Sequence, residues 1–93
     1  MQAANSNDDP QELALRALVC TLAEPMRGFR LLETTGLTPQ DLRERASDPA
    51  VLAAVLGFLE AHEPDLIDCA TTLGVPPGEL VAAHRILARQ ASA

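Results

Sequence analysis

The sequence contains no tryptophan, no tyrosine and no lysine, and only two phenylalanines among its 93 residues. Aromatic side chains commonly line pockets for substrates and cofactors, so their scarcity counts against such a site. The chain also lacks a nucleophile beside a general base, and it lacks a glycine-rich loop that would hold phosphate. We therefore expect a protein that is not an enzyme and that carries no cofactor.

Long apolar runs are also missing, because charged residues interrupt each stretch before it approaches the ~20 apolar residues of a membrane helix. The polar opening, residues 1–8, has no basic segment before an apolar run, so it does not resemble a secretory leader. We interpret it as a disordered N-terminal tail. Cys20 and Cys69 lie in apolar stretches, where free cysteine behaves as a small apolar residue. These features predict a cytoplasmic protein that makes no membrane contact.

Basic residues are few, since seven arginines stand against thirteen acidic residues and the net charge is −6. Proteins that bind nucleic acid usually carry the opposite sign, so the balance argues against such a partner. Potential metal ligands are also sparse, and none of them forms a compact Cys-x-x-Cys or His-x-x-x-His pair. The four candidates are Cys20, His62, Cys69 and His84. We expect no metal site.

The seven prolines are informative, because proline is favoured at the first position of a helix. Most of them follow a capping residue and precede apolar residues at three- and four-residue spacing. The predicted helices cover residues 10–23, 25–35 and 39–46, and three more begin at Pro49, Pro64 and Pro77. No segment alternates as a strand. The sequence therefore predicts an all-α protein, a compact bundle of five to six short helices.

The two halves of the chain share this pattern of a capping residue followed by proline. Asp9-Pro10 and Glu24-Pro25 recur as Asp48-Pro49 and Glu63-Pro64, and a G-[LV]-x-P-x-[DE]-L element occurs at residues 36–42 and 74–80. Chance agreement of common helix caps is the alternative explanation. We predict a duplicated three-helix unit, residues 9–47 and 48–90. Units this small bury little surface alone, so we expect one domain over residues 9–90.

The apolar spacing also predicts a core. The side chains expected to point inward are Leu18, Leu22, Phe29, Leu32, Leu42, Leu52, Val55, Leu56, Leu59, Leu66, Leu80 and Leu87. The helix that begins at Pro49 has the widest apolar stripe, and we expect it to be the main core helix.

With catalysis disfavoured, the function that remains is binding another protein or a second copy of this chain. The acidic stretch that begins at Glu60 is the most polarised candidate for a partner surface, although solubility explains the same charges more simply. Its residues are Glu60, His62, Glu63, Asp65 and Asp68.

A helix-turn-helix regulator that binds DNA through residues 66–89 is the alternative, because a Gly74 turn there separates two predicted helices. The first turn of the second helix carries an acid, Glu79, which would face phosphate. The residues that would contact nucleic acid in this alternative are Gln40, Arg43, Arg45, Arg85 and Arg89.

The order of motifs resembles a family of short proteobacterial, all-helical proteins of unknown function. The motifs are GLTPQDLR at residues 36–43, Asp48-Pro49, and AVLGFL at residues 54–59. The resemblance covers about residues 11–88. It implies a helical, stand-alone domain and assigns no reaction, ligand or catalytic residue.

Overall fold

The computed structural model describes residues 9–92, so the predicted tail at residues 1–8 lies outside the described part of the chain. The described residues form six helices and contain no strand. The helices are α2 (Pro10–Ala23), α3 (Pro25–Thr35), α4 (Pro39–Glu44), α5 (Pro49–Glu60), α6 (Glu63–Leu73) and α7 (Pro77–Ser92). The all-α prediction is confirmed.

Four of the six described helices, α2 to α5, begin at a proline that follows a capping side chain, whereas α6 begins at Glu63 without a side-chain cap and α7 begins at Pro77 after Pro76. Asp9, Glu24 and Asp48 each accept hydrogen bonds from backbone N–H groups in the first turn of their helices. Thr38 and Asp41 form a reciprocal capping box with two 3.0 Å hydrogen bonds, so the short helix α4 is real, although it ends at Glu44. These local bonds satisfy N–H groups that the helices themselves leave unpaired.

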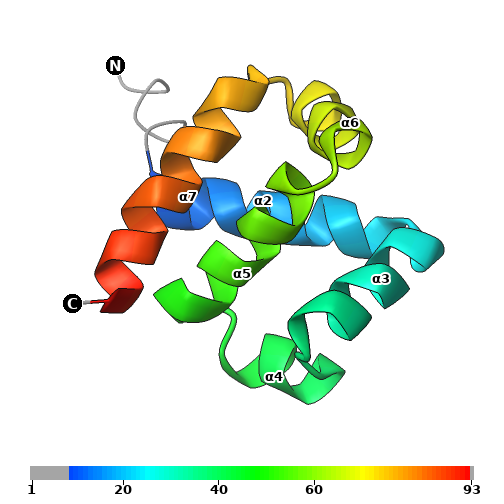
Figure 1. The fold of residues 1–93 in the computed structure, drawn as a ribbon, viewed down its shortest axis with the longest axis vertical. Helices are drawn as coiled ribbons and strands as arrows, with labels where there is room; N and C mark the ends of the chain where they lie inside the picture. The colour runs from blue at the N-terminus through cyan, green and yellow to red at the C-terminus, as the bar shows by residue number, and fades with distance from the viewer. Residues whose placement is uncertain (1–8, 93) are drawn as a thin grey trace.

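Helix α5 lies at the centre of the molecule, with α2 and α7 packed against it (Figure 1). Its composition explains this place, since seven of its twelve residues are buried and they lie all around the helix. Leu52, Val55 and Leu59 are fully enclosed. The prediction that this helix is the main core helix is confirmed.

A glycine allows α7 to approach α5 closely. A Cβ atom added at Gly57 would lie 3.3 Å from the Nε2 atom of His84 on α7. Glycine at position 57 destabilises the helical conformation of α5 by roughly 1 kcal/mol relative to alanine. Its lack of a side chain allows α5 and α7 to lie close together at this position. The ring of His84 is thereby held over α5, with its Nδ1 atom 2.9 Å from Oε2 of Glu60.

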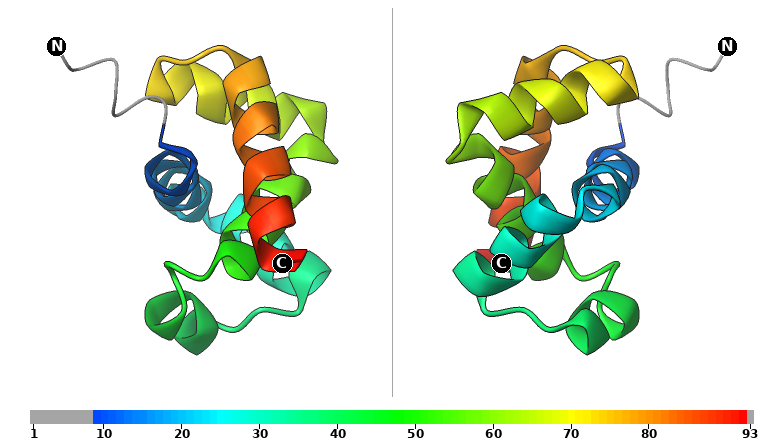
Figure 2. Two further views of the ribbon diagram at one scale, coloured as in Figure 1. Left: turned by 90° about the vertical axis from the view of Figure 1, so that its left-hand side faces the viewer. Right: turned by 90° about the vertical axis from the view of Figure 1, so that its right-hand side faces the viewer.

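Helix α4 is the exception to the close packing. Figure 2 shows it at one end of the molecule, between two connecting segments. Leu42 is its one buried residue. The helix is thus attached mainly through a single side chain.

Two residues of the predicted core are exposed, so these predictions are wrong. Leu22 is 43% exposed and Phe29 is 57% exposed, while Leu32 is partly buried. The reason lies in the orientation of α3, which turns Gly28 and Leu31 inward. The buried side of α3 thus carries Leu31 and most of Arg27, while Phe29 faces solvent. The other nine predicted core residues are buried.

The two halves show matching local structure in part. Gly36 and Gly74, at equivalent places after α3 and α6, both adopt left-handed conformations with φ of 77° and 75°. The third helices differ, because α4 has 6 residues and α7 has 16. The duplication of a three-helix unit stays a prediction.

Candidate protein-interaction surface

Part of the predicted acidic surface is buried and paired with other residues of the chain. Asp65 is only 5% exposed, which corrects the expectation that it faces a partner. Its carboxylate lies 3.0 Å from Nε of Arg27 and 3.1 Å from a terminal nitrogen of Arg30, both on α3. His62 Nδ1 lies 3.0 Å from the same carboxylate. Asp65 therefore joins α6 to α3 and is not available to another protein.

Arg27, whose side chain is 12% exposed, is the second member of this cluster. One of its terminal nitrogens is 2.9 Å from Asp68 and the other donates to the sulfur of Cys69 at 3.7 Å. Its Nε is close to Asp65, but the N–H is not directed at the oxygen, so that contact is an ion pair and not a hydrogen bond. Burial lowers the pKa of Arg27, but the hydrogen bond to Asp68 and the charge of Asp65 together raise it. The guanidinium stays charged inside the fold.

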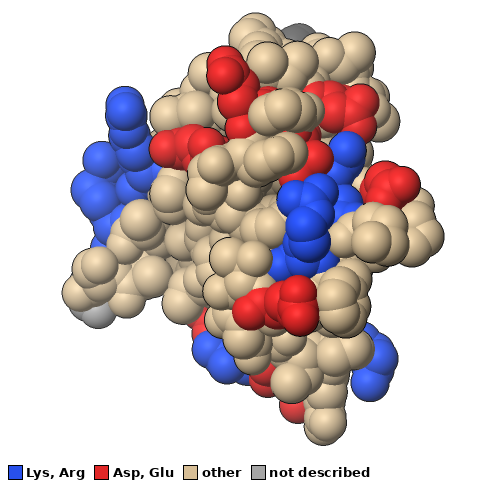
Figure 3. Space-filling model, turned by 45° about the vertical axis from the view of Figure 1, so that its right-hand side comes forward, with Lys and Arg blue, Asp and Glu red and all other residues tan. Residues whose placement is uncertain are grey.

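The remaining predicted acidic residues lie at the edge of this cluster. Glu60 pairs with His84, as described above, and Asp68 pairs with Arg27 although its side chain is 61% exposed. Glu63 is exposed in the first turn of α6, where its negative charge interacts favourably with the helix dipole. At the centre of the face in Figure 3, acidic and basic side chains accordingly lie next to one another. Most of the predicted partner surface is therefore occupied within the chain.

The residues of the DNA-binding alternative are not brought together. Gln40 bonds to Glu44 at 2.9 Å, and Arg45 pairs with Asp48 at 3.0 Å. Arg85 and Arg89 are exposed on α7. The described structure pairs neither of them with an acid. The arginines of α4 and those of α7 thus belong to different helices that do not form one basic stripe.

The two cysteines lie on α2 and α6, and Cys20 is half-buried. Cys69 is buried, and burial together with the Cys20 thiol raises its pKa to about 12. The hydroxyl of Thr21 is 4.0 Å from its sulfur. Within residues 9–92, no three potential metal ligands lie close enough together to hold an ion. The thiol of Cys69 is therefore a protonated core group at neutral pH.

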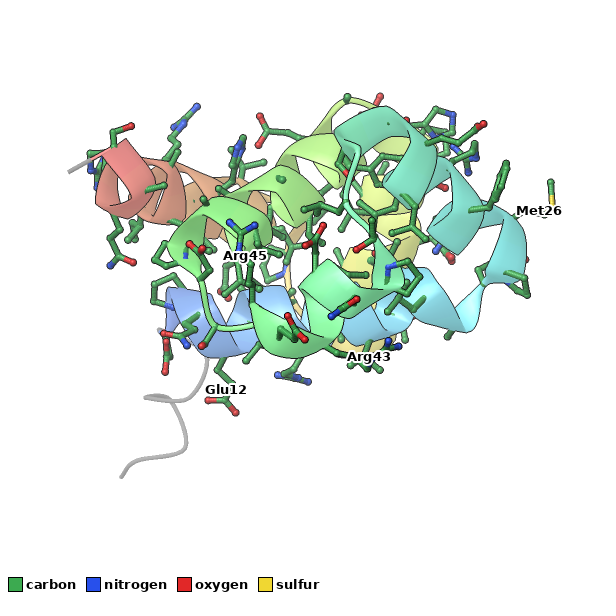
Figure 4. All side chains as sticks on the ribbon, turned by 90° about the horizontal axis from the view of Figure 1, so that it is seen from below. Glu12, Met26, Arg43 and Arg45 are labelled. Carbon is green, nitrogen blue, oxygen red and sulfur yellow. The ribbon has the colours of Figure 1, made fainter. Side chains whose placement is uncertain are left out.

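An apolar surface on α2 and α3 is the feature that the sequence did not reveal. Five large apolar side chains are strongly exposed in the described structure, and four of them lie here. We call Val19, Leu22, Met26 and Phe29 the α2–α3 apolar surface; their exposed fractions are 69%, 43%, 69% and 57%. In Figure 4, Met26 projects from the corner between the two helices.

A groove adjoins this surface between α2, α3 and α4. It has a volume of about 280 Å³, and its walls are Leu18, Leu22, Leu32, Pro39, Leu42 and Arg43. Arg43 is its one charged lining residue, and Figure 4 shows it on α4 beside α2. Leu22 belongs to both the groove and the α2–α3 apolar surface, so the two features are continuous.

Sequence reasoning missed this surface because it assigned Leu22 and Phe29 to the core. A signal was present in the charges. Arg27 and Arg30 stand three residues apart on α3, as do Asp65 and Asp68 on α6. In the structure these arginines pair with these carboxylates across the two helices. Met26 and Phe29, on the same helix as the arginines, stay exposed.

These features define a small all-helical domain with a charge cluster that joins α3 and α6, and with an exposed apolar surface on α2 and α3. None of the described helices is long and apolar enough to cross a membrane. The chain belongs to the family described as "Protein of unknown function (DUF3572)", whose model matches residues 7–90. No curated protein and no solved structure matches the chain. The resemblance seen in the sequence motifs is thereby confirmed as membership of a family without an assigned function.

Proposed function

We propose that this chain is a non-catalytic, cytoplasmic protein-binding module, and that it binds through the α2–α3 apolar surface and the adjoining groove. The observation that carries the proposal is the exposure of four large apolar side chains, Val19, Leu22, Met26 and Phe29, on two helices that contact each other. Single exposed apolar residues are ordinary on soluble proteins. A contiguous apolar patch beside a groove is typical of an interaction site.

Burial of this surface against a binding partner is energetically favourable. Moving one large apolar side chain out of water is worth about 1.5–3 kcal/mol when burial is complete. Met26 and Phe29 are each more than half exposed, so most of that free energy is still available to a partner. Phenylalanine and methionine are also enriched at the centres of protein interfaces. Both residues therefore suit the role of anchors.

The dimensions of the groove favour a protein over a small ligand. Pockets for drug-sized molecules usually measure about 300–1,000 Å³ and carry several polar groups that fix orientation. This groove holds about 280 Å³ and offers one polar side chain, Arg43. Its size and lining fit a single aromatic or aliphatic side chain, as in the anchor pockets of protein interfaces.

The test is affinity capture from a lysate of the organism that encodes the protein, with matched variants. Met26→Ser with Phe29→Ser removes the exposed anchors, and Arg85→Glu with Arg89→Glu is the control on α7. We expect protein partners that the wild type and the control retain and that the serine variant loses. Nuclease treatment should leave them bound.

The helix-turn-helix alternative predicts the opposite pattern. Nucleic acid would be recovered, its binding would fall steeply with salt, and Arg85→Glu with Arg89→Glu would abolish it. That result would replace the protein-binding proposal. Partners that bind the wild type and the serine variant equally would exclude the α2–α3 apolar surface.

A further inference from the structure

The α2–α3 apolar surface combines a protrusion with a recess. Phe29 projects from α3, and Leu32, one turn further along the same helix, lines the groove. Leu22 lies against α3, since a Cβ atom at Gly28 would be 3.4 Å from its Cδ2 atom. A two-fold interface joins the same patch of two identical chains, so it suits a surface that carries both parts.

The charges beside these features are complementary. Glu33 is exposed on α3, four residues after Phe29 and therefore on the same side of the helix. Arg43 lines the groove. Neither side chain forms an ion pair with another residue of the described chain. A phenylalanine that enters the groove from a second copy would bring its neighbouring Glu33 toward Arg43.

We propose that the partner of this surface is a second copy of the chain, in a two-fold dimer. This inference rests on the proposed protein-binding role and names its partner. Phe29 of each copy occupies the groove of the other, and Glu33 of each copy lies beside Arg43 of the other. The contact between unlike charges therefore occurs twice.

The small area of the α2–α3 apolar surface predicts a weak and reversible dimer. From their exposed fractions, the four residues of the α2–α3 apolar surface offer on the order of 400 Å² per copy. Stable interfaces bury about 800 Å² per partner, so this contact belongs to the small class. We expect dissociation in the micromolar range, where dimer formation depends on protein concentration.

Sedimentation equilibrium of the purified full chain, from low micromolar to near-millimolar concentration, tests the proposal. The wild type should pass from monomer to dimer, and Phe29→Asp should weaken the association by about tenfold or more. Arg85→Glu, on α7 at the opposite edge of the molecule in Figure 1, should leave it unchanged. Because Phe29 is exposed, circular dichroism should show that the variant remains folded.

Charge exchange tests the pairing itself. Glu33→Arg alone and Arg43→Glu alone each place like charges together at both contacts, so each purified variant should dimerise more weakly than the wild type. An equimolar mixture of the two should form a mixed dimer, because both contacts then join opposite charges. Structural changes within each single variant would not explain why association is restored only when the two variants are mixed.

A chain that stays monomeric at every concentration overturns the dimer, as does a dimer that Phe29→Asp leaves unchanged. A mixture that associates no better than its components overturns the assigned charge contacts. These failures are distinguishable from failure of the protein-binding role. If the chain is monomeric but captured proteins still depend on Met26 and Phe29, the role stands and the second copy is excluded.

Discussion

Replacing Asp65 by alanine should destabilise the protein far more than a surface change does. The substitution removes a carboxylate that is 5% exposed and that lies within 3.1 Å of three nitrogen-bearing side chains. Removing one partner of a buried ion pair costs about 3–5 kcal/mol, because the other charge stays buried. Arg27 keeps its contact with Asp68, and the side chain of Arg30 is 43% exposed, so we expect a somewhat smaller loss of about 2–4 kcal/mol.

Urea unfolding followed by circular dichroism measures this loss. A domain of this length has a total stability of roughly 4–12 kcal/mol, so the Asp65 variant should unfold at a much lower urea concentration. Asp68→Ala is the matched control, since that carboxylate pairs with the same arginine but is 61% exposed; its loss should stay within about 1 kcal/mol. Equal losses for the two variants would refute the reasoning that burial sets the strength of the cluster.

Three further predictions follow from burial and capping. Leu56→Ala should lower the free energy of unfolding by about 2–5 kcal/mol, whereas Phe29→Ala should lower it by less than about 1 kcal/mol; similar losses in urea unfolding would contradict the assigned burial. Cys69, whose pKa is raised to about 12, should resist iodoacetamide at pH 8 until the chain unfolds, and rapid labelling seen by peptide mass mapping would contradict this. Hydrogen bonds from Thr38 lower the pKa of Asp41 below 3.8, so the stability they provide is present at neutral pH and is lost as pH falls through the folded pKa. Asp41→Asn should therefore make the acid side of the stability profile shallower, and an unchanged slope below about pH 4 would contradict the assignment.

The sequence was sufficient for the helices because their ends are encoded locally. Capping side chains, prolines at the helix starts and the glycines that end α3 and α6 act on neighbouring backbone groups, as the Thr38–Asp41 box and the Gly36 cap illustrate. The central position of α5 was also predictable, because a helix that is apolar on all sides must be surrounded by other helices.

The orientation of α3 was not predictable from its own residues. An amphipathic helix with Met26 and Phe29 on one side gives no local sign that Arg27 faces inward. That choice depends on Asp65 in α6, which is far along the chain and offers Arg27 a buried carboxylate. The candidate site was missed for the same reason: most of the expected acidic surface is paired within the chain, and the expected core residues Leu22 and Phe29 are exposed.

The attachment of α4 by Leu42 has a consequence for the local dynamics of the protein. A helix that buries one side chain separates from the body at a cost far below that of global unfolding, so its backbone amides should exchange with solvent through local opening. Amides of α5 should exchange only when the whole domain unfolds, because that helix is enclosed by its neighbours. Since α4 forms one wall of the groove, each such opening should widen the groove while the helices around α5 stay packed.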